Sequence, residues 1–170
     1  MRTSKTLWSR FDVKKSVLAI LLFVPIGMVV PHFMTFSHST SMGHAFFAMW
    51  PVTLWPSSTP ITVAAGDMVR FPFQDAVTGG ERVFFLKRVA CSEGHMLTVD
   101  HHKMYFCDGQ FLGKAKDTNV KGEPVKNFIW NGLVPKGTFF AIAGHKDSYD
   151  SRYYGFVPVK IIEEWVWPIF

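Results

Sequence analysis

The sequence predicts a mostly β fold preceded by one transmembrane helix. A basic stretch at the N-terminus is followed by an apolar run of 21 residues, 16–36. Beyond residue 36, short apolar or alternating runs are separated by turn residues, above all Gly and Asp, a pattern typical of strands. No segment of this second part has a long helical period.

The formal net charge of +5 is concentrated at the start of the chain. Residues 1–15 hold five basic side chains and one acidic side chain, and residues 16–66 hold no Asp, Glu, Lys or Arg. Residues 67–170 hold 13 basic and 12 acidic residues, so this part is nearly neutral. The near-neutrality excludes a broad phosphate-binding face, and therefore a nucleic-acid partner. A hydrophobic content of 48% excludes an intrinsically disordered chain.

Residues 16–36 are predicted to form a single-pass anchor helix. About 20 apolar residues span a bilayer, and Pro25 and Gly27 are tolerated in such helices. Lys14 and Lys15 place the N-terminus in the cytoplasm by the positive-inside rule. Residues 1–15 then form a cytoplasmic basic segment, and residues 37–170 form a periplasmic domain outside a bacterial inner membrane.

Two other interpretations of the apolar run remain. It is compatible with a cleaved signal peptide, because residues 17–30 resemble an h-region and Ser37-His38-Ser39 offers a small-x-small cleavage site. A buried core helix fits less well, because the basic front and the interior Pro25 are unusual in one.

Six strands are predicted in the second part, each beginning or ending at a turn signal. Gly66-Asp67 precedes the first strand and Gly79-Gly80 precedes the second. Residues 56–60 are predicted to be a rigid loop, and residues 114–126 a polar surface excursion. The predicted strands are residues 68–73, 82–90, 96–99, 104–107, 137–144 and 156–162.

Cys91 and Cys107 are the only two cysteines. They cannot complete a four-ligand zinc site without histidines, and His101 and His102 do not give a standard spacing. We therefore expect no metal or other cofactor. A periplasmic domain permits a disulfide, and both cysteines lie at ends of neighbouring predicted strands. A Cys91–Cys107 bridge and two separate buried thiols both remain open.

Lys87 lies on an apolar strand face. Alternation along a strand places it on the same side as Phe85 and Val89. A lysine in that position is either an edge residue whose amine reaches solvent or a desolvated amine. Desolvation lowers the pKa of an amine, and a neutral amine can act as a general base. Taken alone, Lys87 fits the strand edge better.

Ser41, Asp150 and Arg152 are also ambiguous alone. A serine in a Ser/Thr-rich loop is usually a linker residue, because its hydroxyl attacks a carbonyl only beside a base. A Ser–Lys arrangement supplies such a base. Asp150 and Arg152 are compatible with an ordinary exposed ion pair.

Taken together, four segments resemble the boxes of the type I signal peptidase family, the serine–lysine leader peptidases. They follow the apolar run in the family's order, and the last one is the most specific. The resemblance implies the mostly β signal peptidase fold, covering Ser39 to roughly Pro158. The segments are Ser39-Thr40-Ser41-Met42, Gly66-Asp67-Met68-Val69, Lys87-Arg88-Val89, and residues 148–158 (SYDSRYYGFVP).

The resemblance implies a catalytic role for three of these residues. Ser41 would be the nucleophile and Lys87 the general base. Ser39 would donate its hydroxyl to the oxyanion hole, beside the backbone N–H of Ser41.

The resemblance also implies supporting residues. Ser148 would orient the Lys87 amine, and Asp150 and Arg152 would form a supporting ion pair. The Gly66-Asp67 turn would shape a wall near the site.

The chain departs from the family pattern at three places. His44 stands where the family usually has Pro, two residues after the Ser-Met methionine. Residues 91–95 replace the usual Gly-x-Pro-Gly-Asp, and Gly144-His145-Lys146 replaces Gly-Asp-Asn. These departures affect fine substrate geometry rather than the Ser41–Lys87 dyad, because both residues of the dyad are present.

Within the family, the aromatic stretch 46–51 and the pair Cys91 and Cys107 look closer to the conjugative-transfer branch. That branch, the TraF-type pilin-processing peptidases, matures or cyclises a plasmid pilin. The implied protein is a membrane-anchored serine endopeptidase whose partners are the lipid bilayer and a preprotein or prepilin cut near the membrane. The alternatives are a general signal peptidase for secreted proteins and a non-catalytic membrane assembly protein on the same fold.

Overall fold

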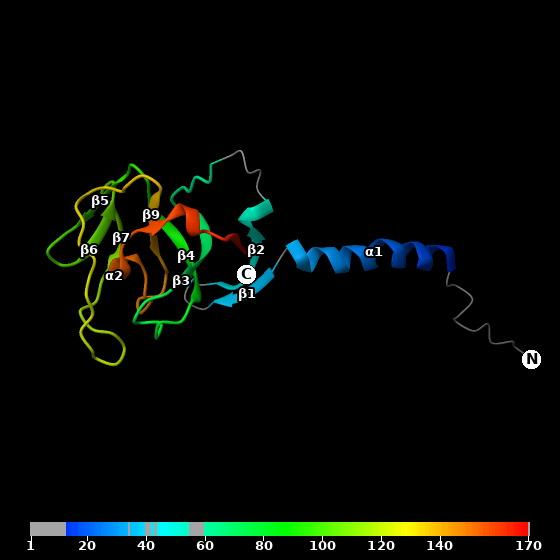
Figure 1. The fold of residues 1–170 in the computed structure, drawn as a ribbon, viewed down its shortest axis with the longest axis horizontal. Helices are drawn as coiled ribbons and strands as arrows, with labels where there is room; N and C mark the ends of the chain where they lie inside the picture. Colours follow the sequence, from blue (N-terminus) through cyan, green and yellow to red (C-terminus); the bar gives the residue numbers. More distant parts are fainter. Residues whose placement is uncertain (1–12, 34, 40–41, 43, 55–59, 170) are drawn as a thin grey trace, which may run out of the picture.

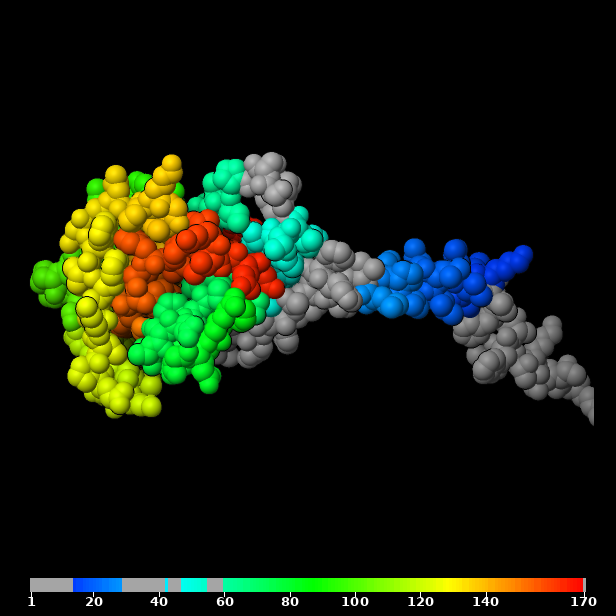
Figure 2. All heavy atoms as spheres, in the orientation of Figure 1, coloured from blue at the N-terminus to red at the C-terminus, as the bar shows by residue number. Residues whose placement is uncertain are grey.

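The computed structural model describes residues 13–33, 35–39, 42, 44–54 and 60–169. Helix α1 (Val13–Phe33) comes first and extends away from a β-rich domain (Figure 1). Figure 2 shows the same arrangement in space-filling form, with the coloured part of α1 standing clear of the domain. The fold is mostly β, as predicted, because strands make up nearly all regular structure after α1 in the described part of the chain.

The larger sheet has seven strands, in the order β1-β2-β11-β3-β4-β9-β10. All neighbouring strands in it are antiparallel. Its strands are β1 (Thr35–Ser39), β2 (His44–Pro51), β3 (Met68–Phe73), β4 (Val83–Ser92), β9 (Thr138–Ile142), β10 (Val157–Pro158) and β11 (Glu164–Pro168).

The smaller sheet has four antiparallel strands, in the order β7-β6-β5-β8. They are β5 (Met96–Val99), β6 (Met104–Cys107), β7 (Gln110–Lys114) and β8 (Gly132–Leu133). Strands β5, β6 and β7 lie at the end of the domain farthest from α1 (Figure 1). The short helices are the 3-10 turn η3 (Val52–Leu54), α2 (Ser151–Tyr154) and the 3-10 turn η4 (Val159–Ile161).

Five of the six predicted strands are confirmed. The strands at 68–73, 96–99 and 104–107 match β3, β5 and β6 to the residue, and those at 82–90 and 137–144 overlap β4 and β9. The strand predicted over 156–162 is wrong beyond Pro158. Proline has no N–H for a strand ladder, and the chain turns after it, with the Ile162 N–H donating to the Val159 carbonyl.

The transmembrane prediction for residues 16–36 is not confirmed. The helix itself is present as α1. In the part of the chain that the structure describes, no helix has both the length and the apolarity needed to cross a membrane.

A β-bulge at Ala90 lets strand β4 serve two separate cores. The pairing of β4 with β9 shifts between Val89 and Cys91, so the two residues do not share a face as simple alternation would require. Val89 joins a core on one face of the larger sheet, with Phe71 and Phe139. Cys91 joins the core between the two sheets.

The structure joins Cys91 of β4 and Cys107 of β6 in a disulfide, with their Cα atoms 5.6 Å apart. Both residues are buried in the core between the sheets. The bridge links positions 16 residues apart, and closing a loop of that size stabilises a fold by about 3 kcal/mol. It therefore ties the smaller sheet to the strand that carries Lys87.

Candidate active site

Lys87 is a buried residue of a central strand. Strand β4 lies between β3 and β9, so the interpretation of Lys87 as a strand-edge residue is wrong. Its side chain is 5% exposed and shares the apolar face of Phe85 and Val89. The Lys87 Nζ donates a hydrogen bond to the Ser148 Oγ at 2.8 Å. The structure thus brings together two residues that are 61 positions apart in the sequence.

An aromatic cluster forms one wall beside the Lys87 amine. The amine lies 4.9 Å from the centre of the Phe85 ring. Phe85 stacks on Phe73 at 4.7 Å, and Phe73 contacts Tyr154 at 4.5 Å between ring centres. Tyr149 closes the group at 5.4 Å from Tyr154. These rings keep water from the amine and offer it no full counter-charge.

Burial is the main influence on the charge of Lys87. It lowers the pKa of the Lys87 amine from 10.5 to about 8, because a charged amine is disfavoured away from water. The negative charge of Asp150 opposes this lowering, and the positive charge of Arg152 adds to it. An amine with this pKa is partly neutral near pH 7 and can accept a proton.

Asp150 and Arg152 form a buried ion pair rather than an exposed one. The Arg152 Nε and Nη2 donate to the two carboxylate oxygens of Asp150 at 2.8 and 2.7 Å. The side chains are 0% and 5% exposed, respectively. Burial opposes the charge of Arg152, but the hydrogen bond and charge of Asp150 outweigh it, so its pKa lies above the ordinary value.

The ion pair forms where the chain enters α2. Asp150 is the N-cap of this helix, and its carboxylate accepts from the Arg152 backbone N–H at 3.2 Å. The same carboxylate accepts from the backbone N–H of Ala143 at 3.2 Å, and the Ser151 Oγ accepts from that of Ala141 at 2.9 Å. Strand β9 pairs with β10 over only two residues. Beyond them, the side chains of Asp150 and Ser151 accept hydrogen bonds from backbone N–H groups that a neighbouring strand would otherwise bind.

Arg152 also connects the site to the smaller sheet. Its Nη1 donates to the Lys114 carbonyl, at the end of β7, at 2.7 Å. Its own carbonyl accepts from the Phe128 N–H at 2.8 Å and from the Tyr105 hydroxyl at 3.0 Å. Arg152 therefore connects α2 to β7 through its side chain and to Tyr105 of β6 through its carbonyl.

Gly155 follows the end of α2 in a conformation and a space that strongly favour glycine. Its φ of 85° lies in the left-handed region, and its N–H bonds to the Ser151 carbonyl. A Cβ atom at this position would lie 3.0 Å from the ring of Phe128. Gly155 therefore allows the segment around Phe128 to pack closely against the end of α2.

Of the residues predicted on the nucleophile side, Ser41 lies outside the described residues. For Ser39 the structure describes only the backbone, in β1, where it pairs with His44. Met42, which directly follows Ser41, is described and buried. It belongs to a core cluster that also contains Met68, and Leu86 packs against this cluster.

Sequence reasoning missed the aromatic residues of the site. Phe73, Tyr149 and Tyr154 had no predicted role, although the alternating pattern of 68–73 and the spacing in SYDSRYY are visible in the sequence. The Tyr149 hydroxyl donates to the Asp75 carboxylate at 2.6 Å, which anchors this side of the cluster. Burial, followed by this bond, raises the pKa of the Tyr149 hydroxyl.

One group in the described part of the chain has the composition of a metal site, namely His95, Cys107 and Asp108. Cys107 is in the disulfide, so it has no thiolate to offer a metal. His95 and Asp108 instead hydrogen-bond each other at 2.6 Å on the surface. This group therefore does not support a metal centre.

We predict that Asp150→Asn lowers the free energy of unfolding by about 3–5 kcal/mol, because it leaves the buried Arg152 without a counter-charge. A matched control is Arg82→Gln, which breaks the exposed pair Arg82–Glu163 and should cost about 0–1 kcal/mol. Denaturant unfolding followed by tryptophan fluorescence measures both. Equal losses of unfolding free energy in the two variants would show that the buried pair contributes no more to stability than the exposed pair does.

The amino-acid sequence matches a known protein family. A family model described as signal peptidase, peptidase S26, matches residues 10–166. A solved signal peptidase I from Enterococcus faecalis V583 is 22% identical to this chain, and the match covers 62% of this chain and 97% of that one at a TM-score of 0.38. No curated protein matches the sequence significantly. Because the family model spans most of the chain, this protein belongs to the signal peptidase S26 family.

Proposed function

We propose that the protein is a serine endopeptidase that cleaves signal or leader peptides with a Ser41–Lys87 dyad. The S26 family consists of serine peptidases, so the coarse activity follows from membership. The observation that carries the dyad is the buried Lys87 amine, hydrogen-bonded to Ser148 and with a pKa of about 8. A lysine with no chemical task is rarely buried so completely without a direct carboxylate partner.

In the proposed reaction, neutral Lys87 takes the proton of Ser41 as the hydroxyl oxygen attacks the scissile carbonyl. Ser39 and the Ser41 backbone N–H stabilise the oxyanion. Protonated Lys87 then donates its proton to the leaving amine, and water hydrolyses the acyl-enzyme. Ser148 holds the amine in one orientation through its 2.8 Å hydrogen bond.

The surroundings of Met42 support a nucleophile close to Lys87. Met42 is buried in the cluster against which Leu86 packs, and Leu86 is the residue before Lys87. The same cluster contains Ala143, whose N–H donates to Asp150.

For the substrate, we propose a pilin precursor of the conjugative-transfer type. This rests on the aromatic stretch 46–51 and on the Cys91–Cys107 pair, two features in which the sequence resembles that branch. The precursor would be cut near the membrane. Hydrolysis and cyclisation differ in the mass of the product, because a cyclic product has one water less than the cleaved linear one.

We also propose that α1 lies in a lipid bilayer. Its large apolar side chains are exposed at consecutive positions from Ile20 to Val24, and so on every side of the helix. An all-apolar helix surface is normally covered by protein or by lipid, and the β-rich domain leaves these side chains exposed. Lys14 and Lys15 at its start suit the polar headgroup region.

The dyad predicts that Ser41→Ala and Lys87→Met each reduce cleavage of a candidate prepilin by at least about 10³-fold, because each removes a group that acts in the bond-breaking step. Lys87→Met keeps the bulk of the side chain, and Lys136→Ala, an exposed lysine on a turn, is the control. Mass spectrometry of the products, with a generic presecretory protein assayed in parallel, reads out cleavage, cyclisation and specificity. Normal processing by either dyad variant would refute the dyad.

The pKa of Lys87 predicts a rate that rises with pH. The neutral amine is the active form, so activity is gained as pH rises through about 8. About a tenth of the Lys87 amines are neutral at pH 7 and about nine tenths at pH 9, which gives a rise of about tenfold under single-turnover conditions. A flat single-turnover profile from pH 6 to 9 would argue against a lysine base.

The lipid proposal predicts that the full chain floats with phospholipid vesicles and that Leu21→Lys/Val24→Lys abolishes flotation. Each lysine replaces an apolar side chain by a charged one, which is costly to place in the hydrocarbon of a bilayer. Val120→Lys, at an exposed valine of the β-rich domain, is the matched control and should float normally. Flotation of the double variant at the wild-type level would show that α1 is not the lipid-bound element.

A further inference from the structure

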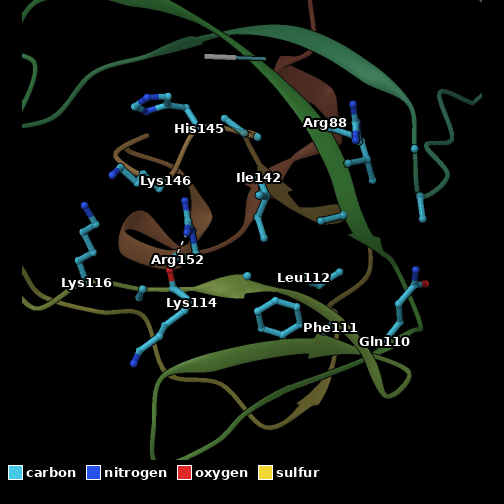
Figure 3. Close-up of a pocket in the computed structure, with 18 of the residues that line it drawn as sticks. Arg88, Gln110, Phe111, Leu112, Lys114, Lys116, Ile142, His145, Lys146 and Arg152 are labelled. Atoms are coloured by element: carbon cyan, nitrogen blue, oxygen red, sulfur yellow. Dashed lines mark hydrogen bonds between the residues drawn. The ribbon is translucent and has the colours of Figure 1, made fainter. Parts of the chain in front are cut away.

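A groove of about 1030 Å³ runs between β4 and β7 (Figure 3). Its volume is at the upper end of the range for ligand sites, which suits a peptide better than a small metabolite. All five residues of β7 line one side, and residues 88–90 of β4 line the opposite side. Residues 143–146 and Arg152 close one end.

The rim of the groove is cationic. Apart from the paired Arg152, its charged lining residues are Arg88, Lys114, Lys116, Lys146 and Asp117. Lys116 pairs with Asp147, and Asp117 pairs with Lys103. Among the described residues, no carboxylate forms an ion pair with Arg88, Lys114 or Lys146, and all three are exposed. The groove therefore carries an excess of positive charge on a domain that is nearly neutral.

The floor of the groove is apolar, and one wall is a strand edge. Phe111, Leu112 and Ile142 line it between the charged groups, as their positions in Figure 3 show. Strand β7 has only β6 as a strand neighbour, so its other edge has no strand partner within the described sheet. Such an edge accepts an extended polypeptide as an added strand.

The groove lies on the face of β4 that carries Leu86 and Arg88, and the Lys87 side chain lies on the opposite face. Leu86 and Arg88 are two residues apart on this strand, and such residues share a face about 7 Å apart. Leu86 packs against the cluster that contains Met42, and Arg88 lines the groove. The groove and the cluster that contains Met42 therefore lie along the same face of this strand.

We propose that this groove binds an extended, acidic stretch of the substrate polypeptide. Backbone groups of the stretch pair with the edge of β7, its carboxylates face Arg88, Lys114 and Lys146, and its apolar side chains cover the floor. The inference rests on the proposed function for the identity of the partner, but the binding itself requires no catalysis.

The position of the groove favours a polypeptide over lipid headgroups. Strand β7 lies at the end of the domain opposite α1, the helix proposed to enter lipid (Figure 1). An apolar floor between charged rims also suits alternating acidic and apolar side chains better than a row of phosphates.

Fluorescence anisotropy on the full wild-type chain tests this inference with three labelled ten-residue peptides. The first alternates Glu and Val, the second has Gln in place of Glu, and the third is the Glu-Val peptide N-methylated at alternate residues. We expect the first to bind at least tenfold more tightly than the other two. Lys114→Glu/Lys146→Glu should weaken its binding at least tenfold, whereas Lys136→Glu/Lys160→Glu, outside the groove, should change it less than twofold.

Three outcomes would overturn the inference. Equal binding of the Glu and Gln peptides would show that the groove does not recognise charge. Full binding of the N-methylated peptide would show that the peptide does not add to β7 as a strand. A loss of binding to phosphatidylglycerol vesicles in Lys114→Glu/Lys146→Glu, with no binding of any peptide, makes the groove a lipid site instead. If the acidic peptide binds as expected but Ser41→Ala still cleaves prepilin, the proposed dyad is wrong and the proposed peptide binding by the groove still holds.

Discussion

The buried ion pair between Asp150 and Arg152 is the interaction on which the rest of the site depends. Its two side chains satisfy the free N–H of Ala143, cap α2 and reach the carbonyl of Lys114. Arg152 also lies 3.5 Å from the Ser148 carbonyl, so it helps to place the residue that holds the Lys87 amine. A charge buried this deeply is tolerated only when it is paired and hydrogen-bonded, and each of the three guanidinium nitrogens of Arg152 has a partner.

The pairing also explains why Lys87 can lose its proton near neutral pH. A lone Asp150 beside the amine would hold it in the charged form, and a lone Arg152 would repel that charge. Because the two charges lie together, their effects on Lys87 oppose each other, and burial remains the dominant influence. The same pair of residues therefore supports the site structurally and leaves burial to dominate the pKa of the Lys87 amine.

The sequence predicts the strands better than the surroundings of the site. Turn glycines and alternation locate β3, β5 and β6, because these strands follow local rules. The β-bulge at Ala90 and the non-local pairings of β11 leave no local trace. Lys87 illustrates the limit most clearly, since only the order of strands shows that β4 is central and its lysine buried. Ser148, Asp150 and Arg152 were found through a family resemblance, because a local pattern does not distinguish a buried ion pair from an exposed one.

The Cys91–Cys107 disulfide has a consequence for the way in which the domain opens. It attaches β6, an inner strand of the smaller sheet, covalently to β4 of the larger sheet. Local unfolding in native proteins proceeds through units of different stability, and the least constrained unit opens first. The inner strands β5 and β6 therefore resist separation, and opening of the smaller sheet begins at its outer strands, β7 and β8. Amide exchange in this sheet should be fastest at these margins and slowest beside the bridge.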